Sequence, residues 1–279
     1  MNRRQFLALS GTGTLACSGC LSRISGIPES RRVSIGDSVV LGDTTLTVSA
    51  PTVQQSIIAD PGVFRSVQQA DDRQYVTVDV QTNSEVRATA AESDDEIRAT
   101  DFHVKRSKDL TRPSNSGEET VRIAPVTREC SGVCLGIPIP AEPTKSAKIV
   151  YRPRDGPGAS WALSEETTRL FAERPVCEWR ETRVVEREGR TALEFSVENV
   201  GPRTAGYRVL VHRQSWNDQS DPVGFEIPVG ETVTETVVPP ILDGLDPASA
   251  TLREGTAGSH DVWVEPRDAT TPSSPTPVS

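Results

Sequence analysis

Short segments in which apolar and polar residues alternate recur along most of this chain. In residues 74–80, Q-Y-V-T-V-D-V, three valines fall on one face of an extended segment. Residues 193–198, L-E-F-S-V-E, repeat the pattern. A period of two is typical of a β-strand that buries one face and exposes the other. Clusters of Gly, Pro, Asp and Ser separate the segments, as turns require. The chain is therefore predicted to be all-β.

The spacing of these segments favours β-sandwich domains over alternating strands and helices. A length of 279 residues allows about two domains, and we expect one sandwich in residues 33–163 and another in 177–265. Residues 164–176 break the alternation. Ser164 is suited to cap a short helix there, and Leu170 and Phe171 are suited to dock this linker between the domains.

The C-terminal end has a different composition. After Glu265 the chain runs into A-T-T-P-S-S-P-T-P-V-S, which is rich in Pro, Ser and Thr. Such a segment has almost no apolar surface to bury against a core. We predict that residues 266–279 form a disordered tail.

The first residues, M-N-R-R-Q-F-L, resemble a twin-arginine export signal. That pattern is an arginine pair followed at fixed spacing by Phe and Leu, here Arg3, Arg4, Phe6 and Leu7. The apolar stretch that follows has about ten residues, half of what a membrane-spanning helix needs. A charged start, a short apolar stretch and small residues are shared by secretory signals. We expect residues 1–19 to be removed on export.

The apolar stretch ends in A-C-S-G-C, where small residues precede Cys20 as in the lipobox of surface lipoproteins. The resemblance implies that the Cys20 thiol carries a lipid and becomes the first mature residue. Cys17 is the alternative, although Ser18 and Gly19 are the small residues that such a site needs. A single acyl chain binds a membrane reversibly, whereas two chains anchor stably. We expect a lipid-anchored protein on the extracellular face of the cell membrane, with residues 20–32 as its tether.

Motifs of immunoglobulin-like modules occur in the second half. Residues 196–212, S-V-E-N-V-G-P-R-T-A-G-Y-R-V-L-V-H, are followed by I-P-V-G-E-T-V-T-E-T. A V-x-N-x-G strand and turn followed by a G-E-x strand resembles the CARDB adhesion domains. The first half, with I-G-D-S-V-V and Y-V-T-V-D-V-Q-T-N, is similar to immunoglobulin-like domains of surface lipoproteins, but departs from them in its long polar loops, notably 83–119. These motifs imply a fold and a cell-surface context and transfer no catalytic residue.

The charge of the chain excludes one class of partner. The net charge is -9, and no basic run follows the N-terminus. Neutralising phosphates requires a basic surface, so nucleic-acid binding is not expected. Only four of the 30 basic residues are lysines. Acid-rich, lysine-poor chains resemble proteins of salt-loving archaea, and the excess negative charge favours solubility.

Three cysteines remain after Cys17 and Cys20. In an oxidising setting Cys130 and Cys134, within E-C-S-G-V-C-L-G, are the natural disulfide pair. Pairing of Cys177 with either of them is the alternative, which would bridge the domains. C-x-x-x-C also occurs in thioredoxin-fold copper chaperones, but those have a Pro after the second Cys and an α/β fold. A redox or copper-handling role for this pair is the second functional hypothesis.

Patterns typical of enzymes are not found in the sequence. It contains no G-x-S-x-G, H-E-x-x-H or G-x-x-x-x-G-K. The histidines, His103, His212 and His260, are far apart, and Met1 is the one methionine, so the usual axial ligand of a blue-copper site is missing. We expect no catalytic residue, no metal and no cofactor.

One loop is the strongest binding candidate. In 213–221, R-Q-S-W-N-D-Q-S-D, Trp216 lies among polar residues between two predicted strands. An exposed Trp in such a loop suits contact with a ligand or partner, and packing of Trp216 back onto the sandwich is the alternative. Together these features favour a non-enzymatic binding protein whose partner is a surface protein or a carbohydrate.

Overall fold

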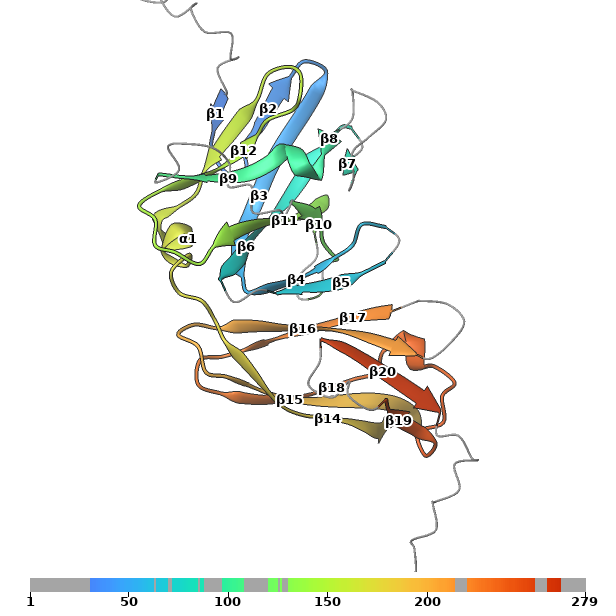
Figure 1. Ribbon diagram of the computed structural model, residues 1–279. Coiled ribbons are helices and arrows are strands. Elements are labelled where there is room, and N and C mark those ends of the chain that lie inside the picture. Colours follow the sequence, from blue (N-terminus) through green and yellow to red (C-terminus); the bar gives the residue numbers. More distant parts are fainter. Residues whose placement is uncertain are drawn as a thin grey trace, which may run out of the picture.

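The computed structural model shows two β-sandwiches stacked on each other (Figure 1). The described residues are 31–62, 64–69, 72–84, 86–87, 97–107, 120–124, 126, 130–213, 220–253 and 260–266. Within these ranges the chain forms strands joined by turns, with one α-helix and two short 3-10 helices. The prediction of an all-β fold is confirmed. No helix in the described part of the chain is long and apolar enough to cross a membrane.

The first sandwich packs a four-stranded sheet against a five-stranded sheet around one core. The order of the four-stranded sheet is β1 (Arg31–Val33), β13 (Ala159–Ala162), β12 (Ala147–Tyr151) and β9 (Phe102–Arg106). The order of the five-stranded sheet is β10 (Val121–Arg122), β11 (Val133–Pro140), β6 (Arg73–Thr82), β3 (Thr44–Gln54) and β2 (Ser38–Leu41). β1 runs parallel to β13, and the other pairs in these two sheets are antiparallel.

The central strand β6 is covered on both faces. Its three valines are almost completely buried in the core with apolar residues of β3 and β11, as the alternation predicts. Thr77 and Asp79, on the opposite face, are also buried. A hairpin of β4 (Ser56–Ala59) and β5 (Ser66–Gln69) lies over that face. The side chain of Ile57 comes within 2.6 Å of the place that a Cβ at Gly136 would take, so the hairpin packs directly on β11.

The described residues of segment 83–119 include strands and a 3-10 helix. β7 (Val86–Arg87) pairs in parallel with β8 (Ile97–Arg98), and the 3-10 helix η1 (Ala99–Asp101) leads into β9. Ile97 and Phe102 are buried in the first core. The expectation of a loop was wrong for this part, because a few apolar residues widely spaced in polar sequence are enough to bury an edge strand.

The edges of the first sandwich also differ from those expected. β1 begins at Arg31, so the last two residues of the predicted tether already belong to the sheet.

The helix α1 (Glu165–Arg169) has Ser164 as its N-cap, which accepts a hydrogen bond from the amide of Thr167 at 3.1 Å. Phe171 is fully buried in the first core. Phe171 thus packs into the first sandwich, whereas the end of the linker contacts the second: the carbonyls of Glu173 and Val176 accept hydrogen bonds from Arg203 and Val200. The linker therefore contacts both sandwiches.

The second sandwich has a three-stranded and a four-stranded sheet. The first has the order β14 (Cys177–Arg187), β15 (Arg190–Asn199) and β18 (Thr232–Val237). The other has the order β17 (Ser220–Ile227), β16 (Ala205–Arg213), β20 (Asp261–Pro266) and β19 (Ala250–Leu252), and η2 (Pro240–Leu242) follows β18. Phe195, Tyr207 and Phe225 join the two sheets through tilted ring contacts.

The V-x-N-x-G motif has a clear structural reason. Asn199 is fully buried, and its amide nitrogen donates to the carbonyl oxygens of Arg203 and Ile227 at 2.8 and 2.9 Å. Its side-chain oxygen accepts a hydrogen bond from the amide of Gly201 at 2.9 Å. A Cβ at Gly201 would lie 2.4 Å from the backbone nitrogen of Val176. The motif thus closes the turn after β15 and holds it against the start of β14.

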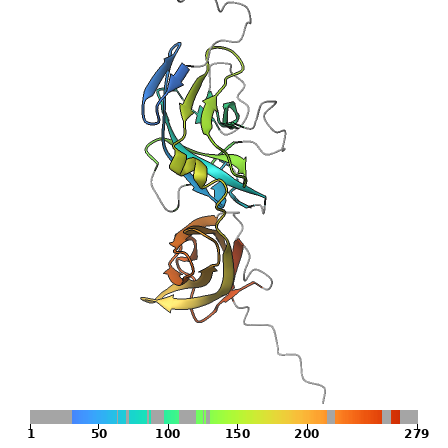
Figure 2. The same cartoon turned by 90° about the vertical axis from the view of Figure 1, so that its left-hand side faces the viewer.

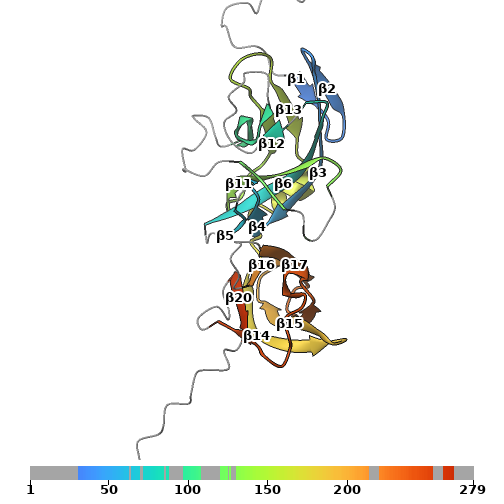
Figure 3. The same cartoon turned by 90° about the vertical axis from the view of Figure 1, so that its right-hand side faces the viewer.

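The two sandwiches pack against each other through buried contacts, and Figures 2 and 3 show the same stacking from two other sides. Ile58 and Ala124 of the first sandwich form an apolar cluster with Leu210 of β16. A Cβ at Gly224 of β17 would lie 2.7 Å from a methyl carbon of Val126. The side chain of Val126 therefore packs directly on the backbone of β17. The molecule is therefore one body with two cores.

Candidate binding site

A cavity of about 490 Å³ opens at one end of the first sandwich. Its walls come from the β2–β3 hairpin, the end of β6, the β8–η1 segment, and the connection from β12 to β13. The lining residues are Leu41, Asp43, Thr44, Ser84, Ile97, Arg98, Asp101, Tyr151 and residues 153–157. Backbone segments distant in sequence therefore meet around one hollow.

The hairpin wall is fixed by side-chain hydrogen bonds to the end of β6. The carboxamide oxygen of Asn83 accepts a hydrogen bond from the amide of Thr45 at 2.8 Å, and its nitrogen donates to the carbonyl of Asp43 at 3.0 Å. The hydroxyls of Thr44 and Ser84 lie 3.5 Å apart. These contacts hold the turn that carries Asp43 at the rim of the cavity.

The opposite wall is built around Asp101. Its carboxylate accepts a hydrogen bond from the amide of Arg98 at 3.2 Å, and its carbonyl accepts one from the amide of Arg152 at 2.8 Å. Burial raises the pKa of the Asp101 carboxyl. Burial, with a smaller contribution from Asp101, raises the pKa of Tyr151 to about 12. The wall therefore offers a neutral phenol beside a carboxylate.

The chemistry of the lining suits a small polar ligand. Asp43, Asp101 and Asp155 supply acceptors, Arg98 and Arg154 supply donors, and the side chains of the first core form an apolar floor. Pockets that bind small molecules combine apolar walls with a few placed polar groups. Charged groups of both signs line the cavity, three acidic and two basic, which favours a molecule rich in hydroxyl or amide groups over a strongly charged one.

The cysteines of the C-x-x-x-C segment lie elsewhere on the first sandwich. Cys130 and Cys134 form a disulfide with a Cα–Cα distance of 5.9 Å, which is the pair that the sequence favours. A Cβ at Gly132 would lie 2.3 Å from the carbonyl oxygen of Val80. The loop between the cysteines is therefore pressed onto the end of β6, and only glycine fits there.

A buried carboxylate faces this disulfide. Cys134 of β11 is directly opposite Asp79 of β6 in the sheet, and Oδ1 of Asp79 lies 3.7 Å from Sγ of Cys134. The ligand atoms of Asp79, Cys130 and Cys134 all lie within 4.8 Å of one another. Sequence reasoning missed Asp79, because the register that places it opposite Cys134 is set by the fold. While the disulfide is intact, neither sulfur is the thiolate that binds metals.

Cys177 forms no disulfide. It is half-buried against the second core. Burial raises the pKa of its thiol to about 11, so the thiolate is scarce near neutral pH. The alternative of a bridge between the domains is not found in the structure.

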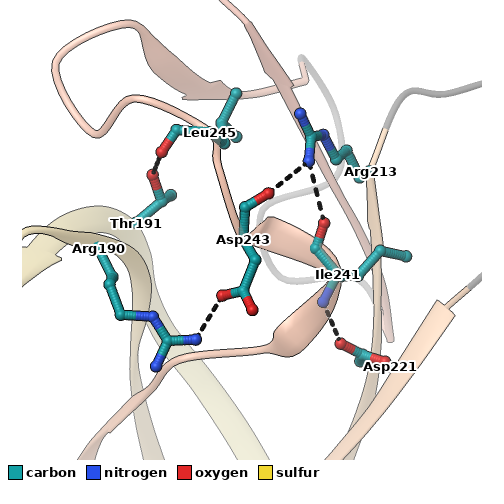
Figure 4. Close-up of polar contacts among 7 residues, drawn as sticks. All are labelled: Arg190, Thr191, Arg213, Asp221, Ile241, Asp243 and Leu245. Carbon is teal, nitrogen blue, oxygen red and sulfur yellow. Dashed lines mark hydrogen bonds and ion pairs between the residues drawn. The ribbon is translucent and has the colours of Figure 1, made fainter.

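Trp216 lies outside the described residues, but the strands on either side of its loop are firmly held (Figure 4). The guanidinium of Arg213 donates to the carbonyl oxygens of Ile241 and Asp243 at 3.5 and 2.8 Å. The carboxylate of Asp221 accepts a hydrogen bond from the amide of Ile241 at 2.6 Å. Both ends of the loop are therefore tied to η2.

The same turn is held by the three-stranded sheet of the second sandwich. Arg190 forms an ion pair with Asp243, and the hydroxyl of Thr191 donates to the carbonyl of Leu245 at 2.6 Å (Figure 4). The network closes this end of the second sandwich by bridging both of its sheets. It gives the Trp216 loop a rigid base.

His103 lies in β9 of the first sandwich, whereas His212 of β16 and His260, just before β20, lie on neighbouring strands of the second. Nε2 of His212 lies 3.0 Å from a carboxylate oxygen of Asp261, and the imidazole stacks on Trp263 with ring centroids 4.4 Å apart. Nδ1 of His260 lies 2.7 Å from the carbonyl of Arg208. Neither is in the one three-ligand group found among the described residues.

The predicted export and lipidation residues, Arg3, Arg4, Phe6, Leu7 and Cys20, also lie outside the described residues, as does most of the predicted C-terminal tail. Comparison with family models, with curated proteins and with solved structures finds no match.

Proposed function

We propose that this chain is a non-enzymatic binding protein of the cell surface, anchored by a lipid on Cys20, that holds a small polar ligand such as a carbohydrate. The supporting observation is the cavity at the end of the first sandwich, with acidic and basic groups on a framework fixed by hydrogen bonds. The stacked body places this cavity on a rigid support, as binding surfaces require.

The same proposal assigns the second sandwich to the CARDB-like group of immunoglobulin-like domains and the N-terminus to twin-arginine export. Support for the first comes from Asn199 and Gly201, whose contacts explain the V-x-N-x-G motif. Support for export comes from the arginine pair and the small residues before Cys20.

Binding is tested with purified full chain on an array of neutral and acidic oligosaccharides. A defined subset should be retained by the native protein and released by the double variant Asp43→Asn and Asp155→Asn. Glu235→Gln, an exposed change on β18 of the second sandwich, is the matched control and should bind as the native chain does. Equal binding by all three proteins would contradict the assignment of the cavity.

Anchoring is tested by the intact mass of protein extracted from membranes. The native chain should have lost residues 1–19 and gained the mass of a lipid. Cys20→Ser should abolish that gain, while Cys17→Ser should not. A chain that retains Met1 and carries no lipid would contradict the anchor.

A second candidate is a redox or copper-handling role for Cys130 and Cys134. The observation that favours it is the Asp79 carboxylate, which completes a compact group of three possible ligands when the disulfide is reduced. Metal analysis of the reduced chain with Cu(I) and with Zn²⁺ tests it. One bound ion that is lost in Asp79→Asn would support this role over a structural disulfide.

A further inference from the structure

The outer face of the four-stranded sheet in the first sandwich is basic. Arg32 of β1, His103 and Lys105 of β9, and Lys148 of β12 lie on it, and Arg152 follows β12 with the same orientation. We call these five residues the basic face. β1, β13 and β12 lie side by side in Figure 3. Arg32, Lys105 and Arg152 are exposed, and the other two are partly exposed.

Pairing of the strands places like charges against each other. Lys148 is directly opposite Lys105 in the register of β12 and β9. Like charges in facing positions of an antiparallel pair destabilise a sheet. In a chain with a net charge of -9, this concentration of positive charge does not follow from composition. It breaks a local rule of stability, and such positions are typical of functional sites.

The basic face has no acidic partners within the described residues. None of its five side chains forms an ion pair or a side-chain hydrogen bond there. Elsewhere the molecule pairs its cations readily, as Arg183 with Glu194 and Arg106 with Glu142 show. The positive charge of the sheet is therefore available to an external anion.

The electrostatics of the individual groups agree with this description. Burial, followed by the charges of Lys105 and Arg32, lowers the pKa of Lys148. Burial, followed by Arg152, Lys105 and Lys148, lowers the pKa of His103. Lys148 and His103 thus experience the positive charges of the neighbouring residues, and an anionic surface would relieve the repulsion at Lys148.

The proposed anchor reaches this face directly. β1, which starts at Arg31, is an edge strand of the same sheet. Ten residues separate Cys20 from Arg31, and a fully extended chain of that length spans about 35 Å. A lipid on Cys20 therefore keeps the basic face close to the bilayer, at a high effective concentration.

We propose that the basic face docks on anionic lipid head groups and orients the protein on the membrane. The inference rests on the proposed lipid anchor for its geometry, and on the charges of the sheet for its chemistry. A basic patch is a recognised second signal that makes lipid anchoring stable.

Vesicle partitioning tests how much the basic face contributes to membrane binding when the chain carries no covalent lipid anchor. The full chain carrying Cys17→Ser and Cys20→Ser is mixed with vesicles of phosphatidylcholine, alone or with phosphatidylglycerol. Lys105→Gln with Lys148→Gln should weaken binding to the anionic vesicles about 30-fold, at ~1 kcal/mol for each basic residue. The control, Arg180→Gln with Arg183→Gln in β14, removes the same charge from the second sandwich and should bind as the parent does. Equal binding by both double variants would overturn the inference.

Lysine acylation gives a readout that resolves single residues in the native, membrane-extracted protein. All four lysines, 105, 108, 145 and 148, lie in the first sandwich segment, so mass spectrometry can assign each. Lys105 and Lys148 should react more slowly on anionic than on neutral vesicles, and about 1 M salt, where the Debye length is ~3 Å, should abolish the difference. If the protection of Lys105 and Lys148 depends on protein concentration and not on the vesicle lipid, a second copy of the chain covers this face. That result would overturn the inference.

The two proposals fail in different ways. In one outcome, the mass of the native chain shows no lipid while the chain with Cys17→Ser and Cys20→Ser still binds anionic vesicles more tightly than neutral ones. In that case the lipid anchor is contradicted and the membrane-binding role of the basic face is supported. If the lipid is present and neither assay depends on lipid charge, the anchor stands and the basic face is wrong.

Discussion

Arg203 of the second sandwich donates a hydrogen bond to the side-chain oxygen of Gln74 in the first, at 2.7 Å. Gln74 is fully buried, and its nitrogen donates to the carbonyl of Phe171 at 2.9 Å. Arg203 also donates to the carbonyl of Glu173 at 2.5 Å. One polar chain therefore crosses the junction in addition to the apolar cluster of Ile58, so the two cores are coupled.

Replacing Arg203 with methionine should weaken this coupling. The change keeps most of the side-chain length but leaves a buried acceptor on Gln74 without its donor, at a cost of ~1–3 kcal/mol. Calorimetry should show the unfolding transition at lower temperature and broadened toward two steps. Arg183→Met, which removes an exposed ion pair, should cost ~0–1 kcal/mol. If the two variants unfold alike, the polar chain does not couple the sandwiches.

Removing the disulfide distinguishes a structural clip from a redox centre. The loop between Cys130 and Cys134 is short, so its closure stabilises the fold by about 2 kcal/mol in the chain-entropy description. Cys130→Ser with Cys134→Ser should lower the free energy of unfolding by that amount, and reductant should lower that of the native chain equally. Cys177→Ser is the control and should keep the sensitivity to reductant. A reductant-sensitive ligand affinity would instead indicate a redox role.

Much of the first core follows from sequence alone, because alternating valines in a strand such as β6 can bury only one face. The other face of β6 does not follow, since nothing in the local pattern indicates that Ile57 will cover it. Which residues pair across neighbouring strands also cannot be predicted from the sequence. Lys105 and Lys148 are distant in sequence, and no basic run marks them, yet the register of β9 and β12 makes them neighbours. Asp79 was missed for the same reason, and so was the cavity, whose walls meet only in the fold.

Cys177 should react slowly with alkylating reagents. Burial raises the pKa of its thiol from 9.0 to about 11, which lowers the thiolate fraction near neutral pH about 100-fold. Iodoacetamide should therefore modify the native protein about 100-fold more slowly than the chain unfolded in urea, as followed by intact mass. Rapid modification of the native protein would show that the start of β14 opens readily, contrary to its packing against the second core.

Tyr207 should make the fold sensitive to alkaline pH. Burial, with a smaller contribution from Cys177, raises its pKa from 10.0 to about 12. The folded chain therefore holds the phenolic proton more tightly than the unfolded chain does. Its contribution to stability is complete below pH 10.0 and is lost as the pH rises toward about 12. At ~1.4 kcal/mol for each pKa unit, the loss amounts to nearly 3 kcal/mol.

Tyr207→Phe removes the titrating group and keeps the ring contacts with Phe195 and Phe225, because the hydroxyl makes no hydrogen bond within the described residues. Urea unfolding should give nearly equal free energies for the two proteins at neutral pH. Above pH 10 the native chain should lose stability more steeply than the variant. Tyr151→Phe in the first sandwich should act with the same sign, since burial raises the pKa of Tyr151 to about 12 as well. Parallel pH profiles for native chain and variants would mean that these phenols ionise as freely in the folded protein as in the unfolded one.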